Sequence, residues 1–99
     1  MLKSLQTTIY QNKINKGFNV SDIPLEFTYL YGEVWEAFEA WRKKKDDLWE
    51  ELADVTIYLL GLAEILWYDM DIEILKKMEK NATRNYITQD NGTNVRIEE

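Results

Sequence analysis

The sequence predicts an all-α protein, with a four-helix bundle-like fold that is assembled as a homo-oligomer. Apolar residues recur at helical spacing along most of the 99 residues, the periodicity of helices with one buried face. Capping and helix-ending residues divide this pattern into four segments. One segment is apolar almost all round, and four short helices cannot cover it without a second copy. We find no repeat or linker, and we expect one domain over residues 1–99.

The first two helices are predicted from their apolar spacing and their end signals. The first spans about residues 2–16, and Gly17 is placed to end it. The second spans about residues 24–44, because Asp22 or Ser21 can cap it and Pro24 is tolerated only in a first turn. The apolar face of the second helix comprises Phe27, Leu30, Val34, Phe38 and Trp41.

The third expected helix spans about residues 47–67 and starts near Asp46 or Asp47. Residues 55–67 are apolar almost all round, which indicates a helix buried on more than one side. One side of it is therefore expected to pack on a second copy of the chain.

The fourth expected helix spans about residues 71–86, with Asp69 and Asp71 available as capping residues. The tail at residues 87–99 contains the turn signal Asp90-Asn91-Gly92 between two short apolar runs. A small hairpin would fit this pattern, but a frayed tail is the expectation, because chain ends are seldom tied down.

Composition narrows the range of possible binding partners. The net charge is −6 and the pI is about 4.7, which argues against binding to duplex nucleic acid, because phosphate contacts need clustered Lys and Arg. No apolar stretch is long enough to span a bilayer, and the N-terminus lacks the apolar run of a signal peptide. We expect a soluble cytoplasmic protein without a membrane partner.

Two pairs of acidic residues carry the functional prediction. Glu33 and Glu36 lie three residues apart in the second expected helix, and Glu51 and Asp54 lie three apart in the third. Residues at this spacing share one helix face, with Cβ atoms about 5–6 Å apart. Both pairs border apolar segments, where charges are seldom left unpaired. If the two helices are neighbours, four carboxylates converge.

Converging carboxylates call for a cation. Four like charges repel one another and raise their own pKa values unless a divalent cation balances them. The chain has no His and no Cys, which excludes thiolate or imidazole zinc sites, His-containing di-iron sites and Ser-His or Cys-His nucleophiles. Oxygen ligands suit Mg²⁺, with Mn²⁺ as a substitute, acting on an anionic substrate.

A polar face on the fourth expected helix could hold that substrate. Lys77, Asn81 and Arg84 recur at spacings of four and three, so they share one side of the helix. Two cations and an amide there could bind phosphate oxygens that the metals do not reach. The alternative is that Lys and Arg late in a helix only complement its dipole.

These residues resemble the MazG-like, all-α nucleoside triphosphate pyrophosphohydrolases, which include dimeric dUTPases and dCTPases and the phosphoribosyl-ATP pyrophosphatases. The resemblance covers roughly residues 18–86. Its first part is a Glu-x-x-Glu, spacer, Glu-x-x-Asp pattern, formed here by Glu33, Glu36, Glu51 and Asp54, with Glu50 completing a Glu-Glu doublet. Its second part is a Lys-Met-x-x-Asn-x-x-Arg run, formed by Lys77, Met78, Asn81 and Arg84. In this order on successive helices, the patterns are specific.

The resemblance implies a MazG-type fold and a chemistry. The four acidic residues would be catalytic and bind Mg²⁺, the metals would hold a nucleoside triphosphate, and a metal-activated water would release a nucleoside monophosphate and pyrophosphate. This agrees with what cations do in phosphoanhydride hydrolysis. Such an enzyme would serve nucleotide-pool house-cleaning. Some relatives carry a further acidic residue where this chain has Gly32, so the general base stays open.

The resemblance also implies a base pocket of apolar and aromatic groups beside the metals, built with the N-terminal region or a second subunit. Trp41, Phe18 and the segment 12–16, which ends at Lys16, are the candidates for substrate binding there. Stacking on an aromatic ring would be the recognition chemistry.

Two alternatives stay open. The apolar third helix and the many aromatic residues also fit a non-enzymatic helical oligomerisation or partner-binding module. Within the enzyme class, a phosphoribosyl-ATP pyrophosphatase would use similar carboxylates. For the assembly, we expect a homodimer or a dimer of dimers.

Overall fold

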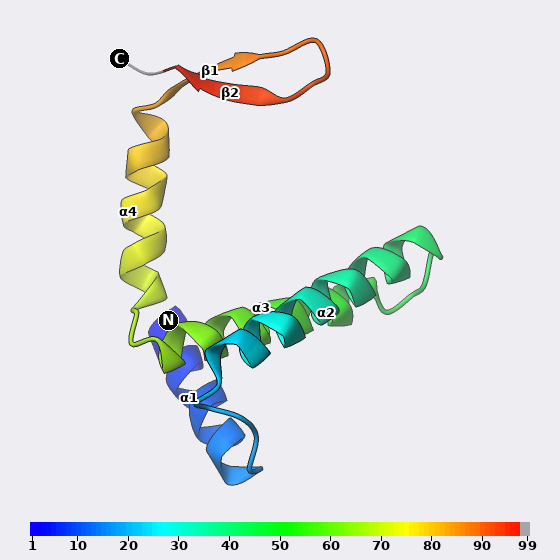
Figure 1. Cartoon of the computed structure of the whole chain (residues 1–99), viewed down its shortest axis with the longest axis vertical. Coiled ribbons are helices and arrows are strands. Elements are labelled where there is room, and N and C mark those ends of the chain that lie inside the picture. Colours follow the sequence, from blue (N-terminus) through cyan, green and yellow to red (C-terminus); the bar gives the residue numbers. More distant parts are fainter. Residues whose placement is uncertain (98–99) are drawn as a thin grey trace.

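The computed structural model describes residues 1–97, which form four helices and a two-stranded antiparallel sheet (Figure 1). The helices are α1 (Leu2–Asn15), α2 (Ile23–Arg42), α3 (Leu48–Ile65) and α4 (Met70–Ala82), and the strands are β1 (Asn85–Thr88) and β2 (Asn94–Ile97). The predicted all-α class is confirmed. Each helix begins within one residue of its expected start.

Capping residues set two of these starts. At α2, the Asp22 side chain accepts a hydrogen bond of 3.1 Å from the backbone N–H of Leu25. Pro24 lies in the first turn, where its missing N–H removes no helical hydrogen bond. At α4, the Asp69 side chain accepts a hydrogen bond of 3.0 Å from the backbone N–H of Asp71. These starts were predictable because capping is local chemistry.

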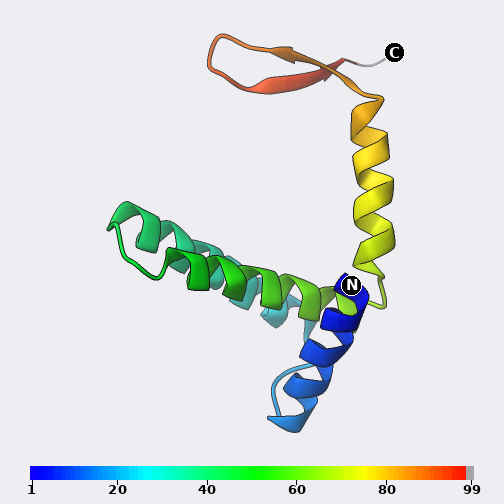
Figure 2. The same ribbon diagram turned by 180° about the vertical axis from the view of Figure 1, so that it is seen from behind.

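Three of the helices form the body of the chain. α2 and α3 run antiparallel and side by side, and α1 packs across α3 (Figures 1 and 2). The close approach of α1 requires a small residue on α3, because a Cβ added at Gly61 would lie 3.2 Å from Cγ2 of Ile9. The buried apolar core is small and consists of Ala37 and Ala40 from α2 and Leu60, Leu62 and Ala63 from α3.

A buried ion pair ties α1 to α2. Lys13 donates a hydrogen bond from its Nζ to Oε1 of Glu26, and both side chains are almost fully buried. The second carboxylate oxygen of Glu26 accepts from Nδ2 of Asn19 at 3.1 Å. Both charges are therefore compensated, as burial requires.

Polar contacts also fix the start of α4 on α1. The fully buried Gln6 donates from Nε2 to the backbone carbonyl of Tyr68 at 2.7 Å, and its Oε1 accepts from the backbone N–H of Met70 at 2.8 Å. Asp71 accepts from the backbone N–H of Lys3 at 3.0 Å, which lowers the pKa of that carboxyl. The direction in which α4 leaves the body is set by these contacts.

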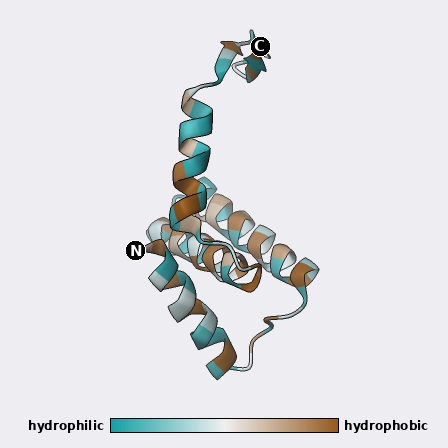
Figure 3. Cartoon of the chain, turned by 90° about the vertical axis from the view of Figure 1, so that its left-hand side faces the viewer, coloured by the Kyte–Doolittle hydropathy of each residue, from teal (hydrophilic) through white to brown (hydrophobic). Residues whose placement is uncertain are grey.

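From that point α4 extends away from the other helices and carries the hairpin at its far end (Figures 1 and 3). Its main contact within the chain is with α1, and none of its residues is buried. The bundle within one chain therefore has three helices, with the fourth projecting from it.

The end of α4 and the tail differ from the expectation. α4 ends at Ala82 rather than near residue 86, and the predicted frayed tail is wrong, because β1 and β2 pair with Ile87 opposite Val95. Gly92, at φ +85°, supplies the left-handed residue that the tight turn requires. Pairing between β1 and β2 satisfies the backbone N–H and C=O groups of the two strands, and the spacing of apolar residues used to predict helices does not reveal this pairing. Residues 98–99 of the expected tail lie outside the described part.

Large apolar side chains remain exposed on every helix of this body and on α4. Examples are Phe18 in the loop after α1 and Trp35, Trp49, Leu75 and Met78 on the later helices. Figure 3 shows such apolar segments along α4. Even so, no helix in the described part of the chain is both long enough and apolar enough to cross a bilayer.

Candidate functional site

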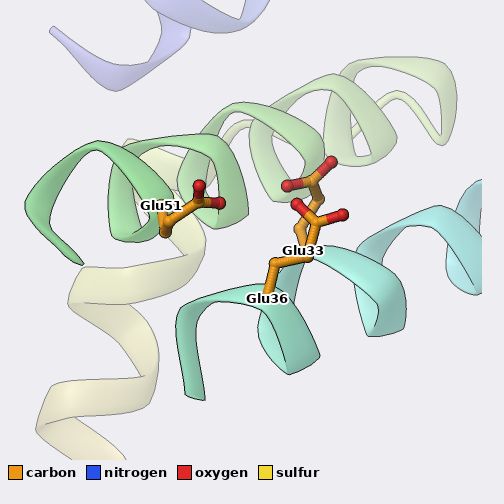
Figure 4. A group of neighbouring side chains, drawn as sticks. All are labelled: Glu33, Glu36 and Glu51. Carbon is orange, nitrogen blue, oxygen red and sulfur yellow. The ribbon is translucent and has the colours of Figure 1, made fainter. Parts of the chain in front are cut away.

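The α2–α3 pair brings three of the predicted carboxylates together (Figure 4). Glu33 and Glu36 extend from α2 toward α3, and Glu51 reaches from α3 toward them. Each offers a carboxylate oxygen, and these three oxygens lie within 4.8 Å of one another. We call Glu33, Glu36 and Glu51 the acidic cluster.

The cluster follows from helix geometry. A spacing of three residues places Glu33 and Glu36 on the same side of α2. The antiparallel arrangement then sets the first turn of α3, which holds Glu51, beside the second half of α2. Two local patterns and one helix–helix contact therefore build the site.

Repulsion and burial act on the cluster. The pKa of Glu33 is raised by partial burial, by the charges of Glu36, Asp54 and Glu51, and by a hydrogen bond with Glu36. The pKa of Glu51 is raised by the same two physical causes, burial and neighbouring carboxylates, Glu36 first among them. The folded chain therefore keeps these groups in an environment that disfavours their charged form.

Two oxygens of the cluster are buried without a partner. Oε2 of Glu33 and Oε2 of Glu51 are closed off from solvent, and neither has a hydrogen-bond partner among the described residues. Buried carboxylate oxygens are normally paired, so this pair of orphans needs an explanation. Oxygen-only donors clustered in this way fit a hard divalent cation such as Mg²⁺ or Mn²⁺, which would supply a partner for these oxygens and a balancing positive charge.

Asp54, the fourth predicted ligand, lies one turn beyond Glu51 on α3 and is exposed. It is not among the three residues whose oxygens meet, although its charge raises the pKa values of both Glu33 and Glu51. Asp54 is therefore beside the cluster, at its solvent-facing edge. Glu50, the first residue of the Glu-Glu doublet, is exposed.

A pocket of about 300 Å³ opens between α1 and α3. It is lined by Thr8, Ile9, Asn12, Lys13, Phe18, Ile57 and Tyr58. The lining is mostly apolar and aromatic with a few polar groups, the usual make-up of a small-molecule site. Phe18, a predicted substrate-binding residue, is part of its wall, and Lys16 holds its Nζ 5.9 Å from the centre of the Phe18 ring.

Tyr58 connects the pocket to the acidic cluster. Its pKa is raised by burial and then by the charges of Glu33 and Glu26, with smaller effects of Tyr29 and Asp54. A second hollow of about 350 Å³ shares Lys13, Phe18 and Tyr58 with the first. Tyr58 thus lines the pocket and lies close enough to Glu33 to be affected by its charge, so the pocket and the cluster are neighbours.

The structure separates Trp41 from this pocket. Trp41 lies in the last turn of α2 and lines another hollow, at the α2–α3 turn, with Lys44 and Lys45. It is 63% exposed and its ring lies 6.1 Å from that of Phe38. Within one chain, Trp41 is not part of the pocket that Phe18 lines.

The predicted phosphate-binding face is also separate. Lys77 and Asn81 are exposed on α4, and Arg84 lies just beyond its end, where Nη1 donates to Oδ1 of Asn81 at 3.4 Å. α4 projects away from the α2–α3 pair that holds the cluster (Figures 1 and 2). Within one chain, these three residues do not meet the carboxylates.

Tyr58 is a site residue that sequence reasoning missed. Tyr58 follows Asp54 by four residues, so it lies on the same face of α3, and that spacing was a usable signal. Lys13 belongs to the candidate segment 12–16, but its pairing with Glu26 was not predicted, because that pairing depends on how α1 crosses α2 and α3.

Comparisons with known proteins agree with this geometry. Residues 25–99 match the MazG-like family. The structure is similar to that of the cyanophage S-2L MazG-like pyrophosphohydrolase, which was solved bound to dGDP and three catalytic Mn²⁺ ions per active site. The TM-score is 0.75 and the identity is 26%, with 99% of this chain and 98% of that chain covered. No curated protein sequence matches the chain.

Proposed function

The chain belongs to the MazG-like family and is a nucleotide pyrophosphohydrolase, and we propose that it hydrolyses (deoxy)nucleoside triphosphates to a nucleoside monophosphate and pyrophosphate with Mg²⁺. The role we propose is house-cleaning of the cytoplasmic nucleotide pool, where its substrates lie. The observation that carries the proposal is the acidic cluster with its two orphaned, buried oxygens.

The cluster is suited to hold the cation that this reaction needs. Glu33, Glu36 and Glu51 would bind it, and Asp54 stands beside them on α3 to complete the ligand set. A divalent cation bound there would polarise phosphoryl oxygens and lower the pKa of a coordinated water. The protein's part is to keep four carboxylates in place against their mutual repulsion, so that the site is ready before the substrate arrives.

The proposal of a hard divalent cation rests on ligand chemistry. All candidate ligands are carboxylates, which bind both Mg²⁺ and Mn²⁺. The similar cyanophage enzyme contains Mn²⁺. We propose Mg²⁺ as the working cation and Mn²⁺ as a substitute.

The pocket beside the cluster is suited to the nucleoside. Phe18 and Tyr58 offer ring faces for stacking a base, and Asn12 offers an amide for its polar edge. Because Tyr58 lines the pocket and lies close enough to Glu33 to be affected by its charge, a base bound in the pocket would lie near a triphosphate held at the cluster. Phe18 and Lys16 are proposed substrate contacts on this basis.

An activity panel tests the proposal. The purified protein is incubated with Mg²⁺ and each of the canonical and several modified nucleoside triphosphates, with nucleoside diphosphates and phosphoribosyl-ATP as further arms. We expect pyrophosphate and a nucleoside monophosphate from at least one triphosphate. Turnover of phosphoribosyl-ATP alone would change the substrate class, and no turnover of any compound by folded protein would rule the proposal out.

Thermal melting provides a test without substrate. A ligand that binds only the folded state raises apparent stability by RT ln(1 + [L]/Kd). We expect Mg²⁺ to raise Tm in the wild-type protein and to have no such effect on Glu51→Gln. A Tm that is indifferent to both Mg²⁺ and Mn²⁺ would contradict a cation site at the cluster.

A further inference from the structure

Lys13 is a buried cation that the function proposed so far does not use. Its side chain is 9% exposed and forms part of the walls of both the pocket and the hollow of about 350 Å³. An ammonium group carries three N–H donors, and among the described residues Glu26 accepts one hydrogen bond from it. A buried donor without an acceptor costs free energy. The pocket therefore holds a cation that can still donate to a ligand.

Contacts on several sides hold Lys13 in place. Its stem crosses α3 at Gly61, where an added Cβ would lie 3.5 Å from Cδ of Lys13. Its Nζ lies over the ring of Tyr58, 5.4 Å from the ring centre. The backbone carbonyl of Lys13 accepts from the N–H of Phe18 at 2.9 Å, which sets a second aromatic side chain beside it. A donor that is held in this way discriminates between ligands, because it cannot move to suit the wrong one.

The partner of Lys13 determines which ligand groups suit this donor. Glu26 is fully buried, and its two carboxylate oxygens already accept hydrogen bonds from Lys13 and Asn19. The ion pair is neutral as a whole, so a phosphate placed beside Lys13 would also meet the negative charge of Glu26. A neutral carbonyl oxygen meets no such repulsion. Together with the mostly apolar and aromatic lining of the pocket, this favours a nucleobase as the ligand of Lys13.

Nucleobases differ at the group that such a donor would meet. Guanine and thymine carry carbonyl oxygens, O6 and O4, where adenine and cytosine carry amino groups. A carbonyl oxygen accepts a hydrogen bond from an ammonium group, whereas an amino group would set two donors face to face. A site built around a hydrogen bond to its substrate strongly rejects an analogue that cannot make that bond.

We propose that Lys13 selects the base of the substrate by donating a hydrogen bond to a carbonyl oxygen on the edge of the base. The preferred substrates are then nucleoside triphosphates whose base carries a carbonyl oxygen where adenine and cytosine carry an amino group. We call these oxo bases; they are guanine, hypoxanthine, uracil and thymine. The inference rests on the proposed function and names its substrate class. Glu26 is a positioning residue that holds Lys13 in the pocket wall.

Paired substrates that differ at this one position test the selection. dITP and dATP form a purine pair of this kind, and dUTP and dCTP form a pyrimidine pair. In the pair that the wild-type protein hydrolyses faster, we expect kcat/KM to be about 10-fold or more higher for the oxo base. In the Lys13→Met, Glu26→Leu variant this oxo-to-amino ratio should fall toward one, because the donor is lost.

The double variant keeps the test independent of folding. Replacing both members of the ion pair leaves no unpaired charge in the buried site. The ratio of two kcat/KM values from one preparation is also independent of the fraction of protein that is folded. Lys3→Met is the matched control, because Lys3 also lies on α1 and pairs with a carboxylate, Glu64, but lines neither hollow. Its oxo-to-amino ratio should equal that of the wild-type protein.

Three results would overturn selection by Lys13. They are equal kcat/KM values within both pairs for the wild-type protein, a preference for the amino bases, and an unchanged ratio in the double variant.

Binding measurements separate this inference from the proposed function. Calorimetry with dIMP, dAMP, dUMP and dCMP compares the same bases without turnover. If the wild-type protein hydrolyses no nucleotide, the proposed function is overturned. Tighter binding of the oxo bases that is lost in the double variant would still support selection by Lys13, and equal binding of all four monophosphates would overturn it.

Discussion

The candidate site of this protein consists of a few carboxylates that the fold places in an environment unfavourable to their charged form. Glu33 and Glu51 have raised pKa values and one orphaned oxygen each, because burial and like charges act together. Keeping these carboxylates charged and close together costs free energy, and this cost indicates a site that binds a ligand of opposite charge. Loss of one carboxylate should therefore remove function without removing the fold.

Glu36→Gln and Asp54→Asn should each lower turnover by more than about 100-fold, because a cation ligand is lost. Both should keep the helical circular dichroism spectrum, since they remove repulsion and no core contact. The matched control is Glu39→Gln, one turn beyond Glu36, whose carboxylate pairs with Arg42 instead. Parallel loss of activity and of helix content would assign these residues a structural role.

Metal-free stability should depend on pH with a definite sign. The folded-state pKa values of Glu33 and Glu51 lie above the ordinary value of 4.5, so the folded state binds these protons more tightly than the unfolded state does. Their contribution to stability is full below 4.5 and is lost as pH rises through the raised values. In EDTA, Tm should therefore increase as pH falls from neutral toward about 5.

The control for this pH effect is the Glu33→Gln, Glu51→Gln variant, in which the same pH change should raise Tm less. Mg²⁺ and protons compete for the same oxygens, so the stabilisation by Mg²⁺ should shrink over the same pH range. A wild-type Tm that falls between neutral pH and about 5 in EDTA would contradict the raised pKa values.

At the scale of the elements, the apolar core is small, and polar contacts help to fix the positions of the helices. Only a few apolar side chains among the described residues are buried, and they belong to α2 and α3. α1 depends instead on the Lys13–Glu26 pair, and α4 depends on Gln6 and Asp71. The pocket wall and the direction of α4 both follow from these contacts, which makes them targets for mutation.

Lys13→Met should lower the free energy of unfolding by about 3–5 kcal/mol, because Glu26 is left buried without its charge partner. Adding Glu26→Leu should restore much of the loss, since no unpaired charge then remains. Lys3→Met is the control: its partner Glu64 lies in a more exposed pair, so we expect a cost of about 1 kcal/mol or less. Urea denaturation measures all three, and equal costs for both lysines would contradict the buried pair.

Gln6→Ala should lower the free energy of unfolding by about 1–3 kcal/mol, because the Met70 N–H and the Tyr68 carbonyl lose their buried partner. Hydrogen exchange should also become faster at the start of α4, where the anchor is lost. Gln11→Ala, on the exposed side of α1, should change neither quantity. Unchanged exchange in α4 after Gln6→Ala would mean that other contacts hold the helix.

The whole molecule is too extended to be a self-contained globule. Its Cα radius of gyration is 16.6 Å, against about 12.6 Å for a compact chain of 99 residues. The projecting α4 and hairpin account for the difference (Figure 1). Apolar residues along α4 and around the α2–α3 pair are exposed, which is the pattern expected of a single subunit whose interfaces are covered in an oligomer.

We therefore expect sedimentation equilibrium to give a mass of two or four times 11.8 kDa. Leu75→Glu with Met78→Glu should shift the equilibrium toward monomer, because both side chains are exposed on α4 and would place charges in the interface. The surface variant Glu79→Gln should leave the mass unchanged. A monomer at every concentration would contradict the homo-oligomer.

Much of the fold was readable from local chemistry. Asp22 and Asp69 cap helices that begin where they were predicted to begin, because a cap depends only on neighbours in sequence. The end of α4 and the hairpin were mispredicted, because the pairing of Ile87 with Val95 depends on residues on both sides of the turn. The same contrast between local and long-range information applies to the predicted site residues. Glu33 and Glu36 share a helix face because of their spacing alone. Trp41 was expected at the base pocket, but the packing of the helices places it away from that pocket.

The sequence by itself determined the four helices, the acidic pairs and the ligand chemistry, since the 3.6-residue period, capping and the lack of His and Cys are properties of the chain. Only the tertiary structure decided that Glu51 meets Glu33 and Glu36, that Tyr58 lines a pocket near this cluster, and that α4 points away from the α2–α3 pair. The physical reason is the distance along the chain over which each kind of interaction acts. Periodicity acts over a few residues, whereas these relations depend on how α1, α2 and α3 pack and on the polar anchors that aim α4 outward.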